Sequence, residues 1–138
     1  MASFKEYGDF DAVGLAEIVR KKHATPTELL DAAIERLEAI DPKINAVPIR
    51  HEDFARRQIA QGLPDGPFRG VPFLLKDLTL LAGTETHFGS RAFLRFTPDH
   101  SSTLVERHLK TGLTISRDCL VENERRICPK RTSPNLTW

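Results

Sequence analysis

The group in this sequence with the clearest chemical potential is the amine of Lys76, which directly follows the apolar run at 71–75. A short apolar run of this kind predicts a buried strand. At the end of such a strand, loss of water would favour the neutral amine over the ammonium ion, and a neutral lysine can act as a general base. The alternative is that Lys76 emerges into solvent, as most lysines do, and pairs with Asp77 or another carboxylate.

The remaining polar residues offer no second catalytic or metal-binding set. The five histidines show no H-x-x-x-H spacing, and the two cysteines, Cys119 and Cys128, lack partners at ligand spacing, so we expect no metal site. Asp99, His100 and Ser101 are the three residue types of a hydrolytic triad, but sequence neighbours cannot stack in the required order. None of the six serines lies in a glycine-rich loop, so no nucleophile is identified.

The predicted helices alternate with short predicted strands, and Lys76 lies at the end of one of these strands. This alternation predicts an α/β fold. The clearest helix start is Thr25-Pro26-Thr27-Glu28, where Thr25 and Glu28 would form a capping box. This helix should end at Asp41, because a residue before proline is disfavoured in the helical conformation. Other helices are expected from Asp11 to Lys22, over 51–61 and from Ser101 or Ser102 to Gly112. In the last of these helices Leu104, Val105, His108 and Leu109 should face the core. Strands are expected at 44–49, 71–75 and 113–115, and a loop at 62–70.

The composition is that of a soluble globular domain. Hydrophobic residues make up 40% of the 138 and charged residues 28%, with a net charge of +1. No overall positive field therefore indicates a nucleic-acid partner. The apolar runs are far shorter than the roughly 20 residues of a membrane span, and the polar amino-terminal residues resemble no signal peptide. We expect a cytoplasmic protein without a membrane or nucleic-acid partner, and its oligomeric state stays open.

Residues 70–91, GVPFLLKDLTLLAGTETHFGSR, resemble the amino-terminal motif of the amidase signature family. In that motif a G-[VI]-P-[FI]-x-[LIV]-K-D strand end precedes a G-T-x-T-x-x-G-S turn. The capped T-x-x-E-L segment, the D-P-x-[IL]-N-A at 41–46 and the helix and strand at 99–115 are similar too, so the resemblance covers residues 8–115. It implies the amino-terminal part of an α/β/α amidase signature fold, whose mixed central sheet would be incomplete here.

The resemblance also implies a reaction for Lys76. Enzymes of the family hydrolyse carbon–nitrogen bonds of amides through a Ser–cis-Ser–Lys triad, and by position Lys76 would be the general base. It would act through a bridging serine on the nucleophilic serine that forms an acyl-enzyme. Neither a metal nor an organic cofactor is implied, and the substrate would be a small-molecule amide. The glycine- and serine-rich segment that supplies both serines has no counterpart here, so we expect a truncated amidase-type hydrolase that is inactive as this chain.

Residues 116–138 depart from the family pattern and form a predicted non-family tail after an amidase portion at 1–115. The family strand usually continues into G-K-x-N-x-P-E, which Ser116-Arg117-Asp118-Cys119 replaces here. One interpretation is a reading-frame shift near Ile115, with the tail disordered. A rival is a binding module whose tail, with five basic and three acidic residues, takes an anionic partner, although no aromatic residue separates the basic ones. A non-catalytic fragment is the third alternative.

The frame-shift interpretation makes a prediction about the gene. Read in another frame just after codon 115, the nucleotide sequence should continue as family-like text. Permissible codons for residues 128–138 can encode P-Q-A-N-I-T-E-P-H-L, which resembles the family a little beyond the N-x-P-E segment. Sequencing the gene tests the interpretation, and it fails if neither alternative frame continues the family pattern.

Overall fold

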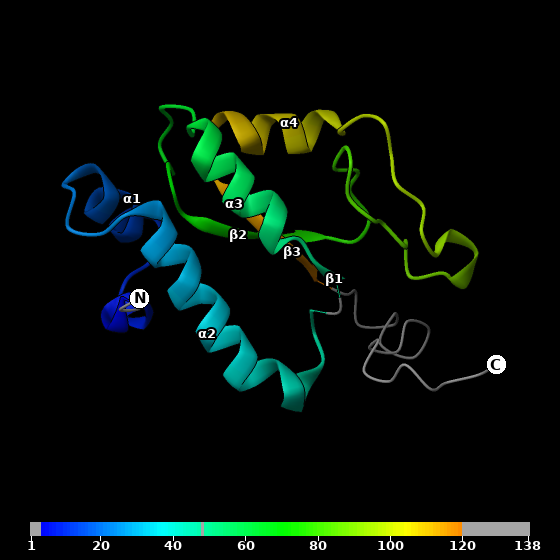
Figure 1. Cartoon of the computed structure of the whole chain (residues 1–138), viewed down its shortest axis with the longest axis horizontal. Coiled ribbons are helices and arrows are strands. Elements are labelled where there is room, and N and C mark those ends of the chain that lie inside the picture. The colour runs from blue at the N-terminus through cyan, green and yellow to red at the C-terminus, as the bar shows by residue number, and fades with distance from the viewer. Residues whose placement is uncertain (1–3, 48, 120–138) are drawn as a thin grey trace.

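The computed structural model describes residues 4–47 and 49–119 as helices around a small sheet (Figure 1). The helices are η1 (Lys5–Asp9), α1 (Ala12–Arg20), α2 (Pro26–Ile44), α3 (Glu52–Gln61), η2 (Arg91–Phe93) and α4 (Thr103–Lys110), where η marks a 3-10 helix. The strands are β1 (Ile49–Arg50), β2 (Pro72–Lys76) and β3 (Thr114–Cys119). Within the described ranges, none of the helices combines the length and apolar character that a membrane span requires.

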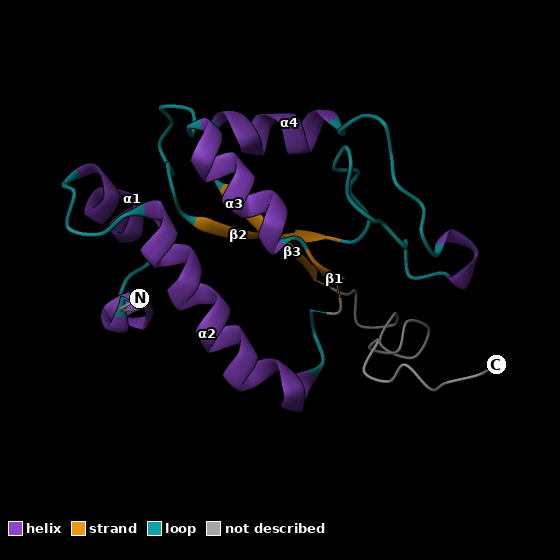
Figure 2. Cartoon of the chain, viewed as in Figure 1, coloured by secondary structure: helices purple, strands orange, loops and turns teal. Residues whose placement is uncertain are grey.

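The strands of the described residues form one mixed sheet in the order β1-β3-β2 (Figure 2). Strand β2 runs parallel to β3, with Pro72 opposite Thr114 and Lys76 opposite Cys119, and β1 runs antiparallel to β3. A parallel pair needs a long crossover connection, and α4 lies in the connection between β2 and β3. The predicted α/β class and mixed sheet are confirmed, with β2 at one edge of the sheet as described.

Two clusters of buried side chains hold the sheet to the helices. The first lies at the start of the parallel pair and contains Leu15, Ala16, Ala24, Leu29, Val71 and Leu113. The second lies further along the pair and contains Leu75, Leu81, Val105 and Ile115. Phe73 of β2 packs against both clusters. The sheet is therefore fixed to α1 and α2 at one end and to α4 at the other.

The predicted helix starts are confirmed. The N–H of Glu28 donates to Thr25 Oγ1 (3.2 Å) and the N–H of Thr25 donates to Glu28 Oε2 (2.7 Å), which completes the capping box of α2. Asp11 caps α1, and Ser102 rather than Ser101 caps α4. Each of these side chains satisfies a backbone donor that the first turn of a helix leaves free.

Helix α2 ends later than predicted. It continues through Pro42 to Ile44, so the predicted end at Asp41 is wrong. The buried carboxylate of Asp41 accepts the N–H groups of Ala46 (2.7 Å) and Val47 (3.0 Å). These bonds stabilise the last turn and offset the unfavourable pre-proline conformation and the hydrogen bond that Pro42 cannot donate.

Two strands differ in length from the prediction. Strand β1 is Ile49–Arg50 and overlaps the expected 44–49 only at Ile49, and α2 occupies the first expected residue, Ile44. Strand β3 runs on to Cys119, beyond the expected end at Ile115. The described part of the predicted tail, 116–119, is therefore strand, and the rest of that tail, 120–138, lies outside the described residues.

The burial of α4 differs from the prediction at its first apolar residue. Leu104 is 52% exposed, whereas its neighbour Val105 is fully buried. His108 and Leu109 are half-buried, as expected of the inner face. The stripe that contacts the sheet is thus narrower than predicted, because the short helix turns Leu104 away from it.

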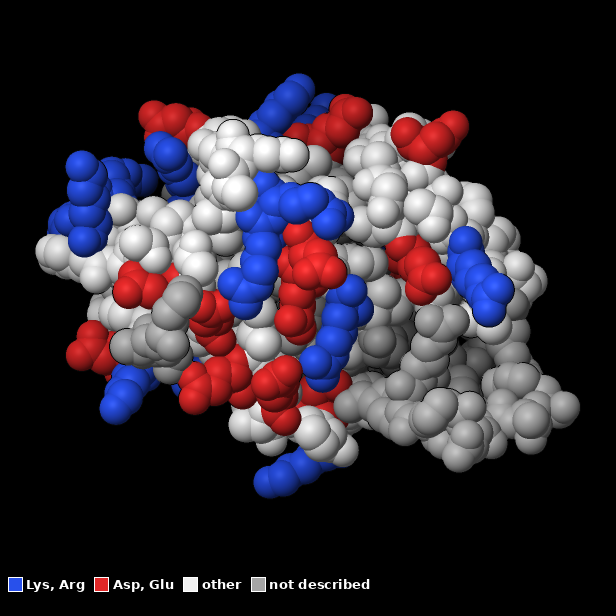
Figure 3. Space-filling model, viewed as in Figure 1, with Lys and Arg blue, Asp and Glu red and all other residues white. Residues whose placement is uncertain are grey.

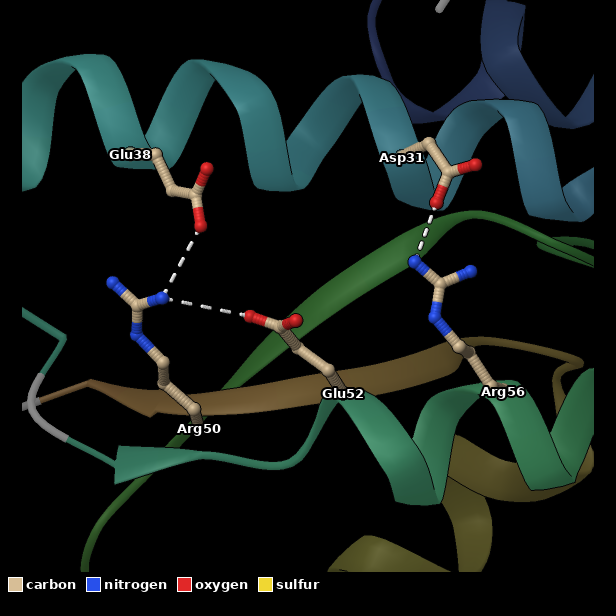
Figure 4. A network of polar contacts seen from close by, with 5 residues as sticks. All are labelled: Asp31, Glu38, Arg50, Glu52 and Arg56. Atoms are coloured by element: carbon tan, nitrogen blue, oxygen red, sulfur yellow. Dashed lines mark hydrogen bonds and ion pairs between the residues drawn. The ribbon is translucent and has the colours of Figure 1, made fainter. Parts of the chain in front are cut away.

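Ion pairs join α2 to β1 and α3 across the surface (Figure 4). Arg56 Nη2 lies 2.7 Å from Asp31 Oδ1, and Arg50 Nη1 lies 3.3 Å from Glu38 Oε1 and 3.8 Å from Glu52 Oε1. The side chains are partly exposed, so each pair contributes no more than about 1 kcal/mol. Charges of both signs alternate over this face (Figure 3), which shows no broad patch of one sign.

Replacing Thr25 by alanine should weaken α2, because the capping hydroxyl is lost while the helix stays otherwise intact. We expect the free energy of unfolding to fall by about 1 kcal/mol, measured by urea denaturation followed by circular dichroism. Thr27→Ala is the matched control, since Thr25 and not Thr27 accepts the capping hydrogen bond. Equal stability of the two variants would contradict the role of the cap.

The same cap should make stability depend on pH. Hydrogen bonds from the N–H and hydroxyl of Thr25 lower the pKa of Glu28 from its usual 4.5. A carboxyl whose pKa is lowered by folding adds stability above its unfolded pKa, and that stability is lost as the pH falls through the folded pKa. Glu28→Gln, which mimics the protonated form, should be less stable than the original chain at pH 7, and the difference should shrink as the pH falls below the unfolded pKa in urea titrations. A difference that stays constant over this pH range would contradict this.

Candidate functional site

Lys76 is the last residue of β2 and lies at the carboxyl end of the parallel pair. Its side chain is exposed, and the ion pairs found among the described residues do not include Lys76. Within the described residues Lys76 is therefore exposed rather than desolvated, as the alternative expected, and the ion pair that the alternative included is not found there. The reason is that β2 is an edge strand of the described sheet, where Leu74, on the same face, is also 40% exposed.

The backbone of Lys76 is held by the turn that follows the strand. Its carbonyl oxygen accepts both the N–H (3.0 Å) and the hydroxyl (2.8 Å) of Thr79. Within this turn Leu78 is 49% exposed. The turn thus fixes the lysine's main chain while its side chain is flanked by exposed leucines on either side.

Asp77, the next residue, is almost completely buried at 1% exposure. Its Oδ1 accepts the N–H of His87 (2.8 Å), and its Oδ2 lies 3.3 Å from the N–H of Gly89, which donates to it. The carboxylate therefore joins the end of β2 to a turn ten to twelve residues further on. Sequence reasoning assigned Asp77 only as a potential partner of Lys76, and the available signal for its actual role was the fixed spacing from K-D to the G-T-x-T-x-x-G-S turn.

The segment after this turn folds back on itself. The N–H of Thr86 donates to the carbonyl of Phe96 (3.0 Å). The rings of Phe88 and Phe93 have centroids 5.2 Å apart, and those of Phe93 and Phe96 are 5.9 Å apart, both in edge-to-face arrangements. Such aromatic pairs stabilise a loop beyond the area they bury. The loop that Asp77 contacts is therefore held together by its own hydrogen bond and by ring contacts at its surface.

Three serines of the described residues accept backbone hydrogen bonds in turns and caps, and Ser116 is buried in β3. Ser101 Oγ accepts the N–H of Ala82 (3.0 Å), and Ser90 Oγ accepts the N–H of Ala92 (3.3 Å). Ser102 caps α4. The cap at Ser102 is one of the two that the sequence predicted, and none of the contacts of Ser90, Ser101 and Ser102 joins a hydroxyl to Lys76.

The adjacent Asp99, His100 and Ser101 do not form a catalytic set. His100 Nδ1 lies 2.7 Å from Asp99 Oδ1 on the surface, and this hydrogen bond lowers the pKa of the Asp99 carboxyl. The hydroxyl of Ser101 is used by Ala82 instead. Nor do the described residues contain a group of three or more His, Cys, Asp or Glu arranged to hold a metal ion.

The model of the amidase family matches residues 28–116, which include most of α2, Lys76, the Asp77 turn and α4. This chain belongs to the amidase family. The predicted resemblance to amidase signature enzymes over an amino-terminal portion is thereby confirmed, and the match ends at Ser116, next to the predicted end of the family pattern at Ile115.

Curated amidases resemble the chain over about three quarters of its length. It is 38% identical over 108 residues to a 6-aminohexanoate-cyclic-dimer hydrolase of Pseudomonas sp. strain NK87, a match that covers 76% of this chain and 22% of that protein. It is 35% identical over 107 residues to the putative amidase AmiC of Mycobacterium tuberculosis strain H37Rv, with 77% of this chain and 23% of that protein covered.

Solved amidase structures have the same arrangement of elements. A 6-aminohexanoate cyclic dimer hydrolase complexed with substrate superposes with a TM-score of 0.73 at 34% identity, over 80% of this chain and 23% of that one. The native peptide amidase of Stenotrophomonas maltophilia gives a TM-score of 0.70 at 29% identity, over 82% of this chain and 25% of that one. This amidase chain thus spans about a quarter or less of the length of the relatives it matches.

Proposed function

We propose that this chain forms the amino-terminal part of an amide hydrolase in which Lys76 is the general base. The observation that carries the proposal is the place of Lys76 within the amidase match, at the carboxyl end of β2 in the K-D motif. A base at the end of a strand is held by the sheet behind it, which favours a fixed geometry toward a reacting group.

The chemistry follows the triad that the family resemblance implies. The amine of Lys76 takes a proton from a bridging serine, which takes the proton of a nucleophilic serine as its oxygen attacks the amide carbonyl. The carbon–nitrogen bond breaks, the leaving amine takes up a proton, and an acyl-serine ester remains. Water then hydrolyses the ester and restores the serine. The proton taken from the nucleophilic serine passes back through the bridging serine to the leaving amine. Water then supplies OH to the acyl group and the proton that restores the serine, so the steps balance without a change of oxidation state.

The environment of Lys76 supports a site that a further region completes. Leu74 and Leu78, two residues to either side of the lysine, are 40% and 49% exposed. Exposed apolar side chains that lie together mark surfaces for contact with other protein. A region packed over them would remove water from the amine, which favours its neutral, basic form. The nucleophilic and bridging serines would come from that region, and the chain alone would not hydrolyse amides.

The substrate class is a small-molecule amide. The relatives with 38% and 29% identity are a 6-aminohexanoate-cyclic-dimer hydrolase and a peptide amidase. Both reactions cleave a carbon–nitrogen bond. We propose the same bond class for the completed enzyme.

Complementation tests this function directly. The 138-residue chain is mixed with a carboxyl-terminal fragment of the 6-aminohexanoate-cyclic-dimer hydrolase that begins after the region of the match. Amide hydrolysis is followed by release of amine from a panel of simple amides. We expect no turnover from either piece alone, turnover from the mixture, and a loss of about 10²–10⁴-fold with Lys76→Ala, the usual contribution of a general base.

Lys110→Ala, an exposed lysine at the end of α4, is the matched control and should keep full activity. If the mixture with Lys76→Ala hydrolysed amides as fast as the mixture with the original chain, Lys76 would not be the general base. Lysine-dependent turnover from the chain alone would mean that one of its own serines is the nucleophile, which would contradict the proposed division of the site.

A further inference from the structure

We propose that Asp77 is a positioning residue for Lys76: its buried carboxylate fastens the turn at 87–89 to the end of β2 and so fixes the direction in which the lysine leaves the strand. The inference rests on the proposed role of Lys76. It adds a residue that does not touch the reacting atoms but holds the one that does.

The contacts of Asp77 are those of an anchor. A carboxylate at 1% exposure is unfavourable unless hydrogen bonds compensate for the lost water. Both oxygens are used, Oδ1 by the N–H of His87 at 2.8 Å and Oδ2 by the N–H of Gly89 at 3.3 Å. Hydrogen bonds to an ionised acceptor are stronger than those between neutral groups. The bonds therefore hold the turn against the strand rather than merely satisfying the carboxylate.

The turn needs such an anchor because of its backbone. Phe88, between the two donors, has a φ of +51°, and Gly89 has a φ of +64°. The left-handed conformation is unfavourable for a residue with a side chain such as Phe88 and persists only where the surroundings compensate. Here the backbone N–H groups on either side of Phe88 converge on one carboxylate, as they do in backbone anion sites.

Fixing Asp77 also fixes Lys76, because the two Cα atoms are separated by a single peptide unit of about 3.8 Å. Lys76 is the exposed last residue of β2, and the buried Asp77 is the first residue of the turn that follows. Anchoring this turn on the buried side therefore leaves the lysine side chain on the exposed side. Thr79 holds the lysine's carbonyl from the other direction. The contacts of Asp77 and Thr79 thus restrain the main chain where the turn leaves Lys76. The amine of Lys76 lies on the exposed face of β2.

The test measures the turn and the lysine separately by NMR on the full chain. In the original chain, the amides of His87 and Gly89 should exchange with solvent as slowly as those in the core of β2. Asp77→Asn keeps the size of the side chain but cannot accept both bonds, so exchange at these two amides should become about ten- to a hundredfold faster. The side-chain resonances of Lys76 should shift in the same variant, and Asp77→Glu should restore part of both effects.

Asp65→Asn is the matched control, since Asp65 is exposed and its contact with Arg69 is long at 3.9 Å. Rapid exchange of both amides in the original chain would overturn the anchor, and this measurement decides even if Asp77→Asn fails to fold. A released turn with unchanged Lys76 resonances would overturn the positioning role and leave Asp77 as a support for the turn. None of these readouts requires hydrolysis, so a failed complementation assay and a failed anchor are distinguishable.

Discussion

The parallel pairing of β2 with β3 is the interaction on which the rest of this structure depends. It joins residues 72–76 to residues 114–119 and brings Leu75 and Ile115 into the same apolar cluster. The connection between the strands must then cross the sheet, and α4 makes that crossing with Val105 packed into the cluster. Everything proposed for the site, from the place of Lys76 to the anchor at Asp77, refers to the end of this one pair.

Local signals predicted the helix starts well because they depend on residues only a few positions apart. Thr25 and Glu28 form their capping box within one turn, whatever the rest of the chain does. The end of α2 could not be read in the same way. The pre-proline rule gave Asp41 as the last residue, but it does not anticipate that the Asp41 carboxylate accepts the N–H groups of Ala46 and Val47. A side chain that serves the chain beyond its own helix depends on the fold of that chain.

At the candidate site, too, local sequence predicted some features, and others depend on segments distant in sequence. The position of Lys76 at a strand end followed from the apolar run before it, and its family from ordered motifs over the matched region. Its exposure did not follow, because whether a strand is covered on both faces depends on segments distant in sequence. The role of Asp77 was missed for a similar reason. Its partners, His87 and Gly89, lie across a turn whose left-handed residues no pattern of residue types predicted.

The place of β3 in the chain has a consequence for the order in which the protein folds during synthesis. Helices α1 and α2 contain their own caps and can form as soon as they leave the ribosome. Strand β2 cannot pair until β3, the last described element, has followed it. Non-local pairings of this kind are slow to form. The segment that carries Lys76 is therefore fixed only when β3 follows it, and during that interval helices are the only folded elements against which it can pack.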